Sequence, residues 1–256
     1  MSKLKTKEDT IAFLAERNQT IDPRLERIFD IPQHDQRSDE WYKLREQRLT
    51  ASDVATAIGM NPYSSRADLV YKKSGGPNTF KGNEATKYGQ KWEDHAIARY
   101  EEKTGKKVIE FGLIPHPTIE MLGGSPDGVC TDCTVIEVKC PLKREIIPGE
   151  IPSYYFPQVQ VVMECLNMEA TDFIQYKPPL NGEEILEILH IKRDREWFAR
   201  YFPVMRLFWS EVLHYREIGL EHNPVHIKKE ADKKKKEEKK TQKVEPDFKK
   251  FMFSKK

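Results

Sequence analysis

The chain has 256 residues, and its 43 Lys and Arg nearly balance its 41 Asp and Glu. This length can build one sizeable core, and no apolar run approaches the length of a bilayer span, so we expect a soluble protein without a membrane partner. The first fifteen residues carry acids and no apolar signal-type stretch, so we expect an intracellular protein whose four cysteines stay as free thiols.

Charge is distributed unevenly along the chain. Residues 228–256 hold 13 lysines and six acidic residues, a local charge of +7, whereas residues 1–227 hold 30 basic and 35 acidic residues. A polyanion would have to meet local basic patches or this tail, because the body has no general positive field. Residues 228–243 contain no apolar residue larger than Ala, so we expect a mobile or marginally helical tail.

Periodicity and capping residues predict the elements in chain order. A helix is expected over 6–18, and a short helix begins near Thr50 or Ser52 and ends at Gly59. A longer helix over 83–103 is stopped by Gly105. The remaining elements are strands at 107–114, 118–122, 128–130 and 134–140, a helix at 155–166, strands at 170–177 and 184–193, and a helix at 194–215.

This order of elements predicts an α/β (α+β) fold with one central mixed β-sheet flanked by helices. We expect one domain over residues 38–220. A helical lead-in, residues 1–37, precedes it, and the lysine-rich tail, residues 221–256, follows it as a flexible segment.

The segment G-S-P-D-G-V-C-T-D-C-T-V-I-E-V-K-C-P, residues 124–141, places charges inside a predicted β-hairpin. Side chains alternate along a strand, so Glu137 and Lys139 share one face. An odd-numbered loop centred on residue 132 or 133 would set Asp127 opposite Glu137 or Lys139, within about 5 Å. An even-numbered loop would instead turn Asp127 to the other face.

Two carboxylates that lie close together repel each other unless a positive charge lies between them. Oxygen ligands at this spacing suit Mg²⁺ or Mn²⁺, which share their coordination shell with water and substrate phosphates. Lys139 could orient a water or stabilise the charge of a transition state, so the pattern indicates hydrolysis of a phosphodiester. The alternative is a solvated hairpin in which Lys139 forms an ordinary ion pair.

Two helices carry polar side chains on the stripes that should face the sheet. Glu93 shares a stripe with Gly89, Ala96 and Tyr100, where a carboxylate is costly unless it is paired or binds a metal, and Gly89 would let the sheet approach closely. A partly exposed glutamate is the alternative. Gln158 lies on the stripe of the later helix, where a buried amide needs partners.

Four ordered segments resemble the phage lambda-type exonucleases, also called YqaJ-type viral recombinases, of the PD-(D/E)XK nuclease superfamily. The segments are W-Y-K-L-R-E-Q-R-L-T-A-S-D-V, Y-G-Q-K-W-E-D-H-A, G-S-P-D-G-V with I-E-V-K-C-P, and Y-Y-F-P-Q-V-Q. The resemblance covers about residues 38–177. It implies a restriction-endonuclease-like core and makes residues 38–220 a nuclease domain.

The resemblance also implies roles for particular residues. The catalytic set would be Glu93, Asp127, Glu137, Lys139 and Gln158. Of these, Asp127, Glu137 and Glu93 would bind Mg²⁺, with Mn²⁺ as a possible substitute, and Lys139 would position the attacking water. Arg45 and Ser52 would form a pocket for the terminal 5′-phosphate of DNA, which the fork geometry of arginine suits.

Members of the resembled family are Mg²⁺-dependent 5′-to-3′ exonucleases that degrade one strand of linear double-stranded DNA to mononucleotides. They leave 3′ single strands for recombination by a single-strand annealing protein. The resemblance therefore implies double-stranded DNA ends and an annealing protein as partners, a homo-oligomer (a trimer), and a cell that hosts a virus, phage or prophage. The alternatives are an endonuclease or RecB-type nuclease, and a non-catalytic DNA-binding protein on the same fold.

For the cysteines and the remaining polar residues, the sequence gives less specific predictions. Cys130 and Cys133 with Cys140 could form a metal–thiolate site, although free thiols are the simpler reading. Arg48 and His95 are expected on the surface. Residues 60–82 carry basic and aromatic side chains that suit a substrate-facing loop as well as a polar surface loop.

Overall fold

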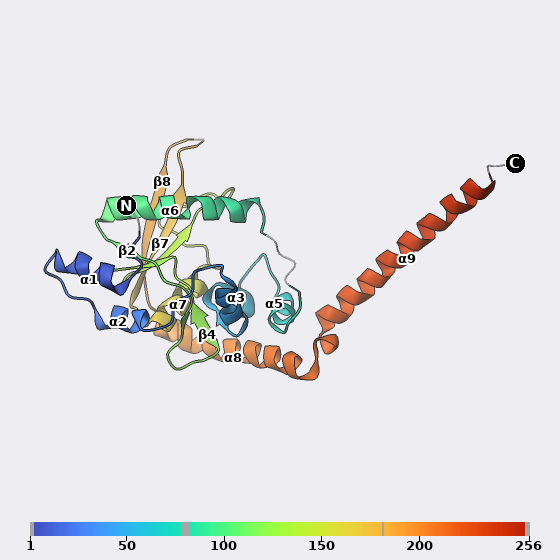
Figure 1. Ribbon diagram of the computed structural model, residues 1–256, viewed down its shortest axis with the longest axis horizontal. Helices are drawn as coiled ribbons and strands as arrows, with labels where there is room; N and C mark the ends of the chain where they lie inside the picture. The colour runs from blue at the N-terminus through green and yellow to red at the C-terminus, as the bar shows by residue number, and fades with distance from the viewer. Residues whose placement is uncertain (1–2, 78–81, 181, 254–256) are drawn as a thin grey trace.

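The computed structural model describes residues 3–77, 82–180 and 182–253, and its centre is a five-stranded mixed β-sheet (Figure 1). The strand order is β2-β5-β6-β7-β8, in which β6 and β7 are parallel and the other neighbours antiparallel. The five strands are β2 (Val108–Ile109), β5 (Gly128–Cys130), β6 (Val135–Lys139), β7 (Ala170–Lys177) and β8 (Ile185–Lys192).

A second, three-stranded sheet has the order β1-β4-β3. Its strands are β1 (Leu49–Thr50), β3 (Ile114–Pro115) and β4 (Leu122–Gly124). The α/β fold with a mixed sheet flanked by helices is confirmed, while hydrogen bonding among the described residues divides the expected single sheet into these two.

Helices cover both faces of the five-stranded sheet. The helices before it in the chain are α1 (Lys7–Ala15), α2 (Pro23–Phe29), α3 (Asp39–Glu46), α4 (Ala51–Ala57), α5 (Arg66–Lys73) and α6 (Glu84–Thr104). The later ones are α7 (Phe156–Leu166), α8 (Arg195–Ile218), a 3₁₀ turn (Leu220–His222) and α9 (Pro224–Phe253). Helix α6 packs its buried side chains against Ile136 and Val138 of β6, whereas α4, α7 and α8 share the larger core cluster with Val135.

The prediction that Gly105 stops the long helix is confirmed, and the structure adds a capping residue at its start. Asn83 is the N-cap of α6, and its side chain accepts a hydrogen bond from the Thr86 amide at 2.9 Å. Gly105 ends the helix in the left-handed conformation, with a φ of 71°. These two residues set where α6 begins and ends, while Ala96, Ile97 and Tyr100 pack the helix against the sheet.

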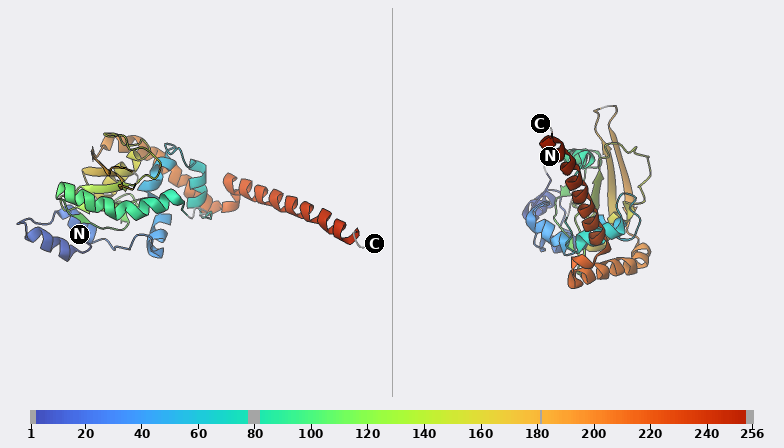
Figure 2. Two further views of the ribbon diagram at one scale, coloured as in Figure 1. Left: turned by 90° about the horizontal axis from the view of Figure 1, so that it is seen from above. Right: turned by 90° about the vertical axis from the view of Figure 1, so that its right-hand side faces the viewer.

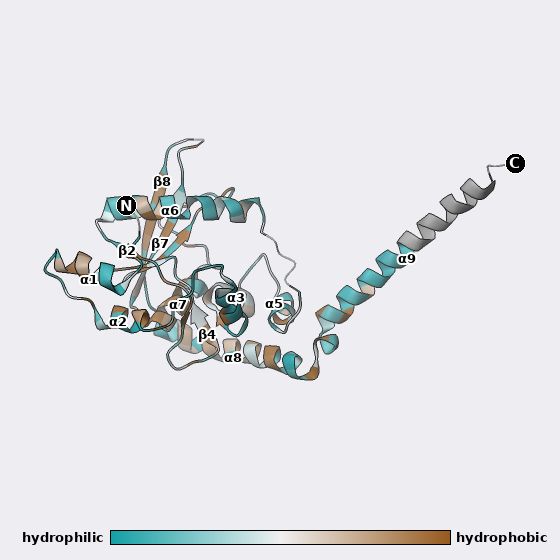
Figure 3. Cartoon of the chain, in the orientation of Figure 1, coloured by the Kyte–Doolittle hydropathy of each residue, from teal (hydrophilic) through white to brown (hydrophobic). Residues whose placement is uncertain are grey.

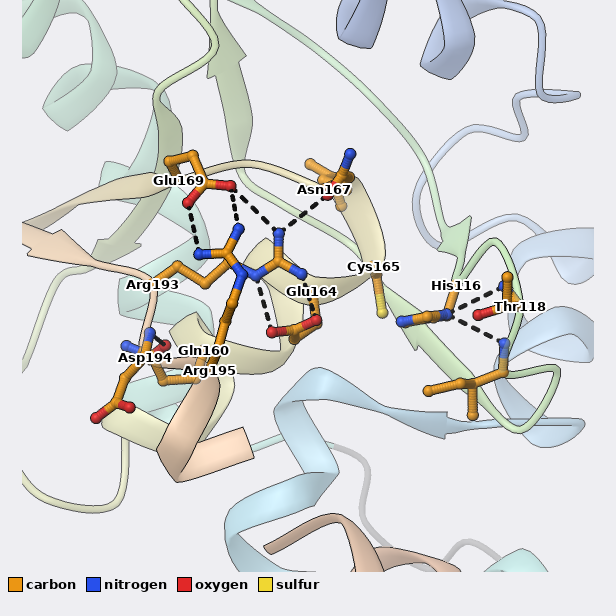
Figure 4. A network of polar contacts seen from close by, with 12 residues as sticks. His116, Thr118, Gln160, Glu164, Cys165, Asn167, Glu169, Arg193, Asp194 and Arg195 are labelled. Carbon is orange, nitrogen blue, oxygen red and sulfur yellow. Dashed lines mark hydrogen bonds and ion pairs between the residues drawn. The ribbon is translucent and has the colours of Figure 1, made fainter. Parts of the chain in front are cut away.

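The strand expected over 107–114 is interrupted, because the lead-in crosses it. The Gly112 amide donates to Gln33 Oε1 at 2.9 Å, and a Cβ at Gly112 would lie 2.4 Å from the His34 carbonyl oxygen. The strand expected over 118–122 is mostly a turn. The His116 Nδ1 accepts hydrogen bonds from the amides of Thr118 and Ile119, so pairing in β4 begins only at Leu122 (Figure 4).

Helix α7 is fixed at its C-terminal half by a buried polar network (Figure 4). Arg193 forms a buried ion pair with Glu164, and its Nη1 donates to Asn167 Oδ1 at 3.0 Å. The Asp194 amide at the start of α8 donates to Gln160 Oε1 at 2.7 Å. The network holds α7 against the end of β8 and so sets the position of its N-terminal turn, which carries Gln158.

Most of the lysine-rich tail forms helix α9, which extends away from the body of the molecule (Figure 2). Hydrophilic residues dominate its described surface, while apolar residues gather in the sheet and in α7 (Figure 3). Residues 60–82, expected as a loop, contain α5, and residues 78–81 lie outside the described residues. Within the described ranges, no helix combines the length and apolar character that crossing a membrane requires.

Candidate active site

The hairpin formed by β5 and β6 brings the predicted carboxylates together. Gly128 pairs with Ile136 and Val129 with Val135, so the connection is odd-numbered and centred on Asp132. One residue further along this register, Asp127 lies across from Glu137. The connection is therefore the odd-numbered one of the two alternatives that the sequence left open. Cys133 takes a φ of 67° in the connection.

Glu137 is the most enclosed carboxylate of the site, with 1% of its surface exposed. Its Oε1 accepts hydrogen bonds from Gln158 Nε2 at 2.5 Å and from the Lys139 ammonium. Its Oε2 is buried and has no hydrogen-bond partner among the residues that the structure describes. Burial raises the pKa of Glu137 to about 8, Asp127 and Glu93 add to the rise, and Lys139 opposes it.

Asp127 and Glu93 line one cavity. Asp127 Oδ2 accepts a hydrogen bond from the Val138 amide at 2.7 Å, which ties the aspartate to β6. Glu93 comes from α6, and its nearest described cation is Arg37, whose Nη2 lies 3.9 Å from Glu93 Oε2. Burial and the Asp127 charge raise the pKa of Glu93 to about 7. The site therefore concentrates negative charge that the described residues only partly neutralise.

Lys139 supplies the positive charge at the end of β6. Burial acts to lower the pKa of Lys139, but the carboxylates of Glu137 and Asp127 outweigh burial and raise it. The Nζ atom also lies 5.1 Å from the centroid of the Tyr155 ring. Lys139 is therefore an ammonium group at any ordinary pH, a hydrogen-bond donor rather than a base.

The cavity has a volume of about 290 Å³, and its walls include Glu93, Asp127, Lys139 and Tyr155. Gly89 also lines it. A Cβ at Gly89 would lie at an ordinary contact distance, 3.9 Å from the Cys140 carbonyl oxygen, so the glycine keeps the cavity open rather than permitting a close approach.

A divalent cation fits the chemistry of this cavity. The free Oε2 of Glu137 and the raised pKa values of Glu93 and Glu137 show that these carboxylates would be stabilised by a bound positive charge. Among the described residues, no group of three His, Cys, Asp or Glu side chains could enclose a metal by itself. This arrangement suits Mg²⁺, which keeps several waters and uses only one or two carboxylates beside substrate phosphates.

Arg45 and Ser52, predicted as a phosphate pocket, lie in contact. Arg45 Nη2 donates to Ser52 Oγ at 2.8 Å, and the guanidinium carbon lies 4.3 Å from the centroid of the Trp41 ring. Ser52 is exposed in the first turn of α4. Helix α4 packs against α7, the helix that carries Gln158, so this pair and the carboxylate cavity are built on neighbouring helices.

A buried lysine that the sequence analysis missed lies beneath this pair. Lys73 Nζ donates to the carbonyl oxygens of Arg45 and Arg48, at 2.8 and 2.9 Å, and forms a 2.9 Å ion pair with Asp53. Burial acts to raise the pKa of Asp53, but Lys73 and Arg45 lower it to about 2. The adjacent Lys72 is exposed, and only the packing of α5 decides which of the two lysines is buried.

Two expectations about polar residues have different outcomes. The prediction that Arg48 is a surface residue is wrong, because Arg48 is half-buried and its enclosed Nε has no hydrogen-bond partner in the described part of the chain. Its Cδ packs over Gly123, where a Cβ would lie only 3.1 Å away. His95 is exposed on α6, as expected, and its ring rests on Trp92.

The four cysteines are buried free thiols. Cys133 and Cys165 belong to the larger core cluster, while Cys130 and Cys140 belong to the cluster beneath α6. Burial raises the pKa of each, to about 12 for Cys130, Cys133 and Cys140. Thiols held protonated in separate apolar clusters do not favour the metal–thiolate alternative.

Solved structures resemble the fold of this chain closely enough to define its structural class. The complex of LHK-Exo with dAMP is 31% identical and matches with a TM-score of 0.62, over 77% of this chain and 99% of its own. LHK-Exo is described as an alkaline exonuclease from Laribacter hongkongensis, and a second structure of it matches with a TM-score of 0.61. The chain therefore has the fold of the alkaline exonucleases.

Within that class, the chain belongs to the YqaJ-like viral recombinase domain family, whose model matches residues 40–171. Protein R354 of Acanthamoeba polyphaga mimivirus is 32% identical over 60% of this chain and 31% of its own length. YqaJ of Bacillus subtilis is 26% identical over 68% of this chain and 56% of its own. The chain thus spans between about a third and about half of the length of these curated relatives.

Proposed function

We propose that this chain is a Mg²⁺-dependent 5′-to-3′ exonuclease that degrades one strand of linear double-stranded DNA to mononucleotides. The observation that carries the proposal is the buried, partnerless Oε2 of Glu137 in a site that also holds Asp127, Glu93 and an ammonium group. The family match and the likeness to an alkaline exonuclease support the same reading. LHK-Exo was solved with a mononucleotide, dAMP, which is the kind of product proposed here.

Asp127 and Glu137 are proposed to hold Mg²⁺, with Mn²⁺ as a possible substitute, and Glu93 is proposed to complete the metal site directly or through a water. The bound cation would lower the pKa of a water and offset the negative charge of the scissile phosphate. Gln158 keeps Glu137 Oε1 occupied through its 2.5 Å hydrogen bond, which leaves Oε2 as the free ligand atom.

Lys139 is proposed to position the attacking water by donating a hydrogen bond. Since its pKa is raised, it holds its proton and also stabilises the charge that develops on the phosphate oxygens. In the reaction the water oxygen forms a new bond to phosphorus, and the bond from phosphorus to the 3′ oxygen breaks. The 3′ oxygen takes up one proton, and water gives up one, so the mononucleotide leaves with a 3′ hydroxyl and the shortened strand keeps a 5′-phosphate.

The direction of digestion is proposed to follow from Arg45 and Ser52. An arginine fork matches the geometry of a terminal phosphate, and the exposed serine hydroxyl beside it adds a donor. Each cut leaves a new 5′-phosphate, so this pocket would receive the product end of every cycle. Double-stranded DNA ends, a single-strand annealing protein and a homo-oligomer such as a trimer remain the proposed partners.

End-labelled DNA tests the proposed activity and its direction. A linear duplex labelled separately at each 5′ and 3′ end is digested in Mg²⁺, beside a covalently closed circle and an EDTA control. We expect early release of labelled mononucleotides from the 5′ ends, an intact circle and no release in EDTA. Cutting of the circle would contradict the exonuclease and favour an endonuclease, and no cutting at all would favour a non-catalytic DNA-binding protein.

A further inference from the structure

Three tyrosine rings form a continuous series that begins at the wall of the active-site cavity. Tyr155 lines the cavity, with Lys139 Nζ 5.1 Å from its ring centroid. The Tyr154 ring centroid lies 4.5 Å from that of Tyr155, and the Tyr63 ring lies 5.4 Å from that of Tyr154. We call these three residues the tyrosine ladder. It connects the reactive end of β6 to the outer surface of the molecule.

The outer end of the ladder is an exposed ring on a fixed piece of backbone. Tyr63 is 78% exposed, so most of its ring faces water. The Tyr63 amide donates to Asn61 Oδ1 at 2.9 Å, and Asn61 Nδ2 donates to Thr56 Oγ1 at 2.7 Å, which anchors the turn to α4. Phe173 of β7 supports the inner end, 5.6 Å from Tyr155. A ring that is exposed but held in place loses little conformational entropy when a ligand stacks on it.

We propose that the tyrosine ladder is a stacking site for nucleobases of the DNA strand that enters the cavity. This inference rests on the proposed nuclease function and assigns to it a contact with bases. An exonuclease that removes every nucleotide in turn must accept all four bases. Aromatic stacking meets that need, because every base has a flat face, whereas hydrogen bonding to base edges would discriminate between sequences.

The length and charge of the ladder fit a strand end. The successive contacts from Lys139 to Tyr63 limit the span of the ladder to roughly 15 Å, the length of about four stacked nucleotides. Lys139 stands at the inner end, and Arg144 lies near Tyr154, where its charge opposes the rise in the pKa of that tyrosine. Cations beside aromatic rings are the combination that binds single strands, since the cations meet phosphates and the rings meet bases.

Fluorescence of 2-aminopurine tests the ladder directly. The base is placed in turn at each of the first five positions from a 5′ end, and Ca²⁺ replaces Mg²⁺ while gels verify that the DNA stays intact. The wild-type chain is expected to quench the probe on binding. Tyr63→Leu should lose at least half of the quench and bind about tenfold more weakly, a change of about 1.4 kcal/mol. Tyr63→Phe, which keeps the ring, should match the wild type.

The control variant is Phe13→Leu, which removes a half-buried ring from α1 that no ring contact joins to the ladder. It should bind and quench like the wild type. Tyr63 is mostly exposed, so the melting temperature of Tyr63→Leu should lie within a few degrees of that of the wild type. If Tyr63 had only a structural role, the substitution would lower the melting temperature but leave the quench at saturating protein unchanged.

Two results would overturn the ladder, and they have different consequences. If Tyr63→Leu quenches and binds like the wild type, the ladder is not a base site, while end-dependent digestion by the wild type would leave the proposed function standing. If the wild-type chain binds no DNA end, both the ladder and the proposed function fail.

Discussion

Replacing Glu93 with glutamine should stabilise the metal-free protein at alkaline pH. The pKa of Glu93 is about 7 in the folded chain against 4.5 for the free side chain, because burial and Asp127 disfavour the charged form. Such a carboxyl contributes its full stability only below pH 4.5, and this contribution is lost as the pH rises through 7. This difference between the two pKa values corresponds to about 3 kcal/mol of unfolding free energy that the wild type loses at high pH. The glutamine variant does not incur this loss, because its side chain is never charged.

The assay is thermal unfolding followed by circular dichroism in EDTA, at pH 5 and pH 8. About 3 kcal/mol corresponds to roughly 10 °C for a chain of this size, so Glu93→Gln should melt higher than the wild type by up to that amount at pH 8 and nearly equally at pH 5. Glu102→Gln, which changes a carboxylate that is 69% exposed on the same helix, should show no such pH dependence. Equal melting of Glu93→Gln and the wild type at pH 8 would refute the reasoning.

Three further substitutions test the rest of the site and its framework. Arg45→Lys keeps the charge but loses the planar fork, so digestion should lose most of its preference for 5′-phosphorylated over 5′-hydroxyl ends, and an unchanged preference would remove the phosphate pocket. Lys73→Met leaves Asp53 without its buried partner and should lower the free energy of unfolding by about 3–5 kcal/mol, which Asp53→Asn in the same chain should largely restore in denaturant titrations. Arg193→Met leaves the buried Glu164 without its ion-pair partner and should lower the free energy of unfolding by a similar amount. A decrease below about 1 kcal/mol would contradict the account of how α7 is held.

The residues that could be predicted from the sequence depend on local rules. Alternation along β6 placed Glu137 and Lys139 on one face, and the odd-numbered connection that the sequence left open sets Asp127 across from Glu137. The helical stripe predicted that Glu93 would face the sheet, and Glu93 lines the cavity. The amide of Gln158 was expected to need a partner, and in the structure Gln158 is half-buried with Glu137 as that partner.

The residues that the sequence did not reveal depend on contacts between distant segments. Lys73 is buried because α5 lies across the ends of α3 and β1, whose carbonyl oxygens need donors. Arg48 is half-buried because Gly123 of β4 leaves room for its side chain. The break in the strand over 107–114 comes from the lead-in crossing at Gly112. No spacing along the chain reports which segments will meet in this way.

The central claim is that Glu137 belongs to a metal-dependent hydrolytic site, and comparing Glu137→Ala with the wild type tests it most directly. Release of mononucleotides from a 5′-phosphorylated linear duplex is measured in Mg²⁺ and in EDTA, and binding of the same duplex is measured in parallel. The account predicts Mg²⁺-dependent release by the wild type, and no release by Glu137→Ala although the variant still binds DNA. Release by Glu137→Ala at the wild-type rate in Mg²⁺ would contradict it.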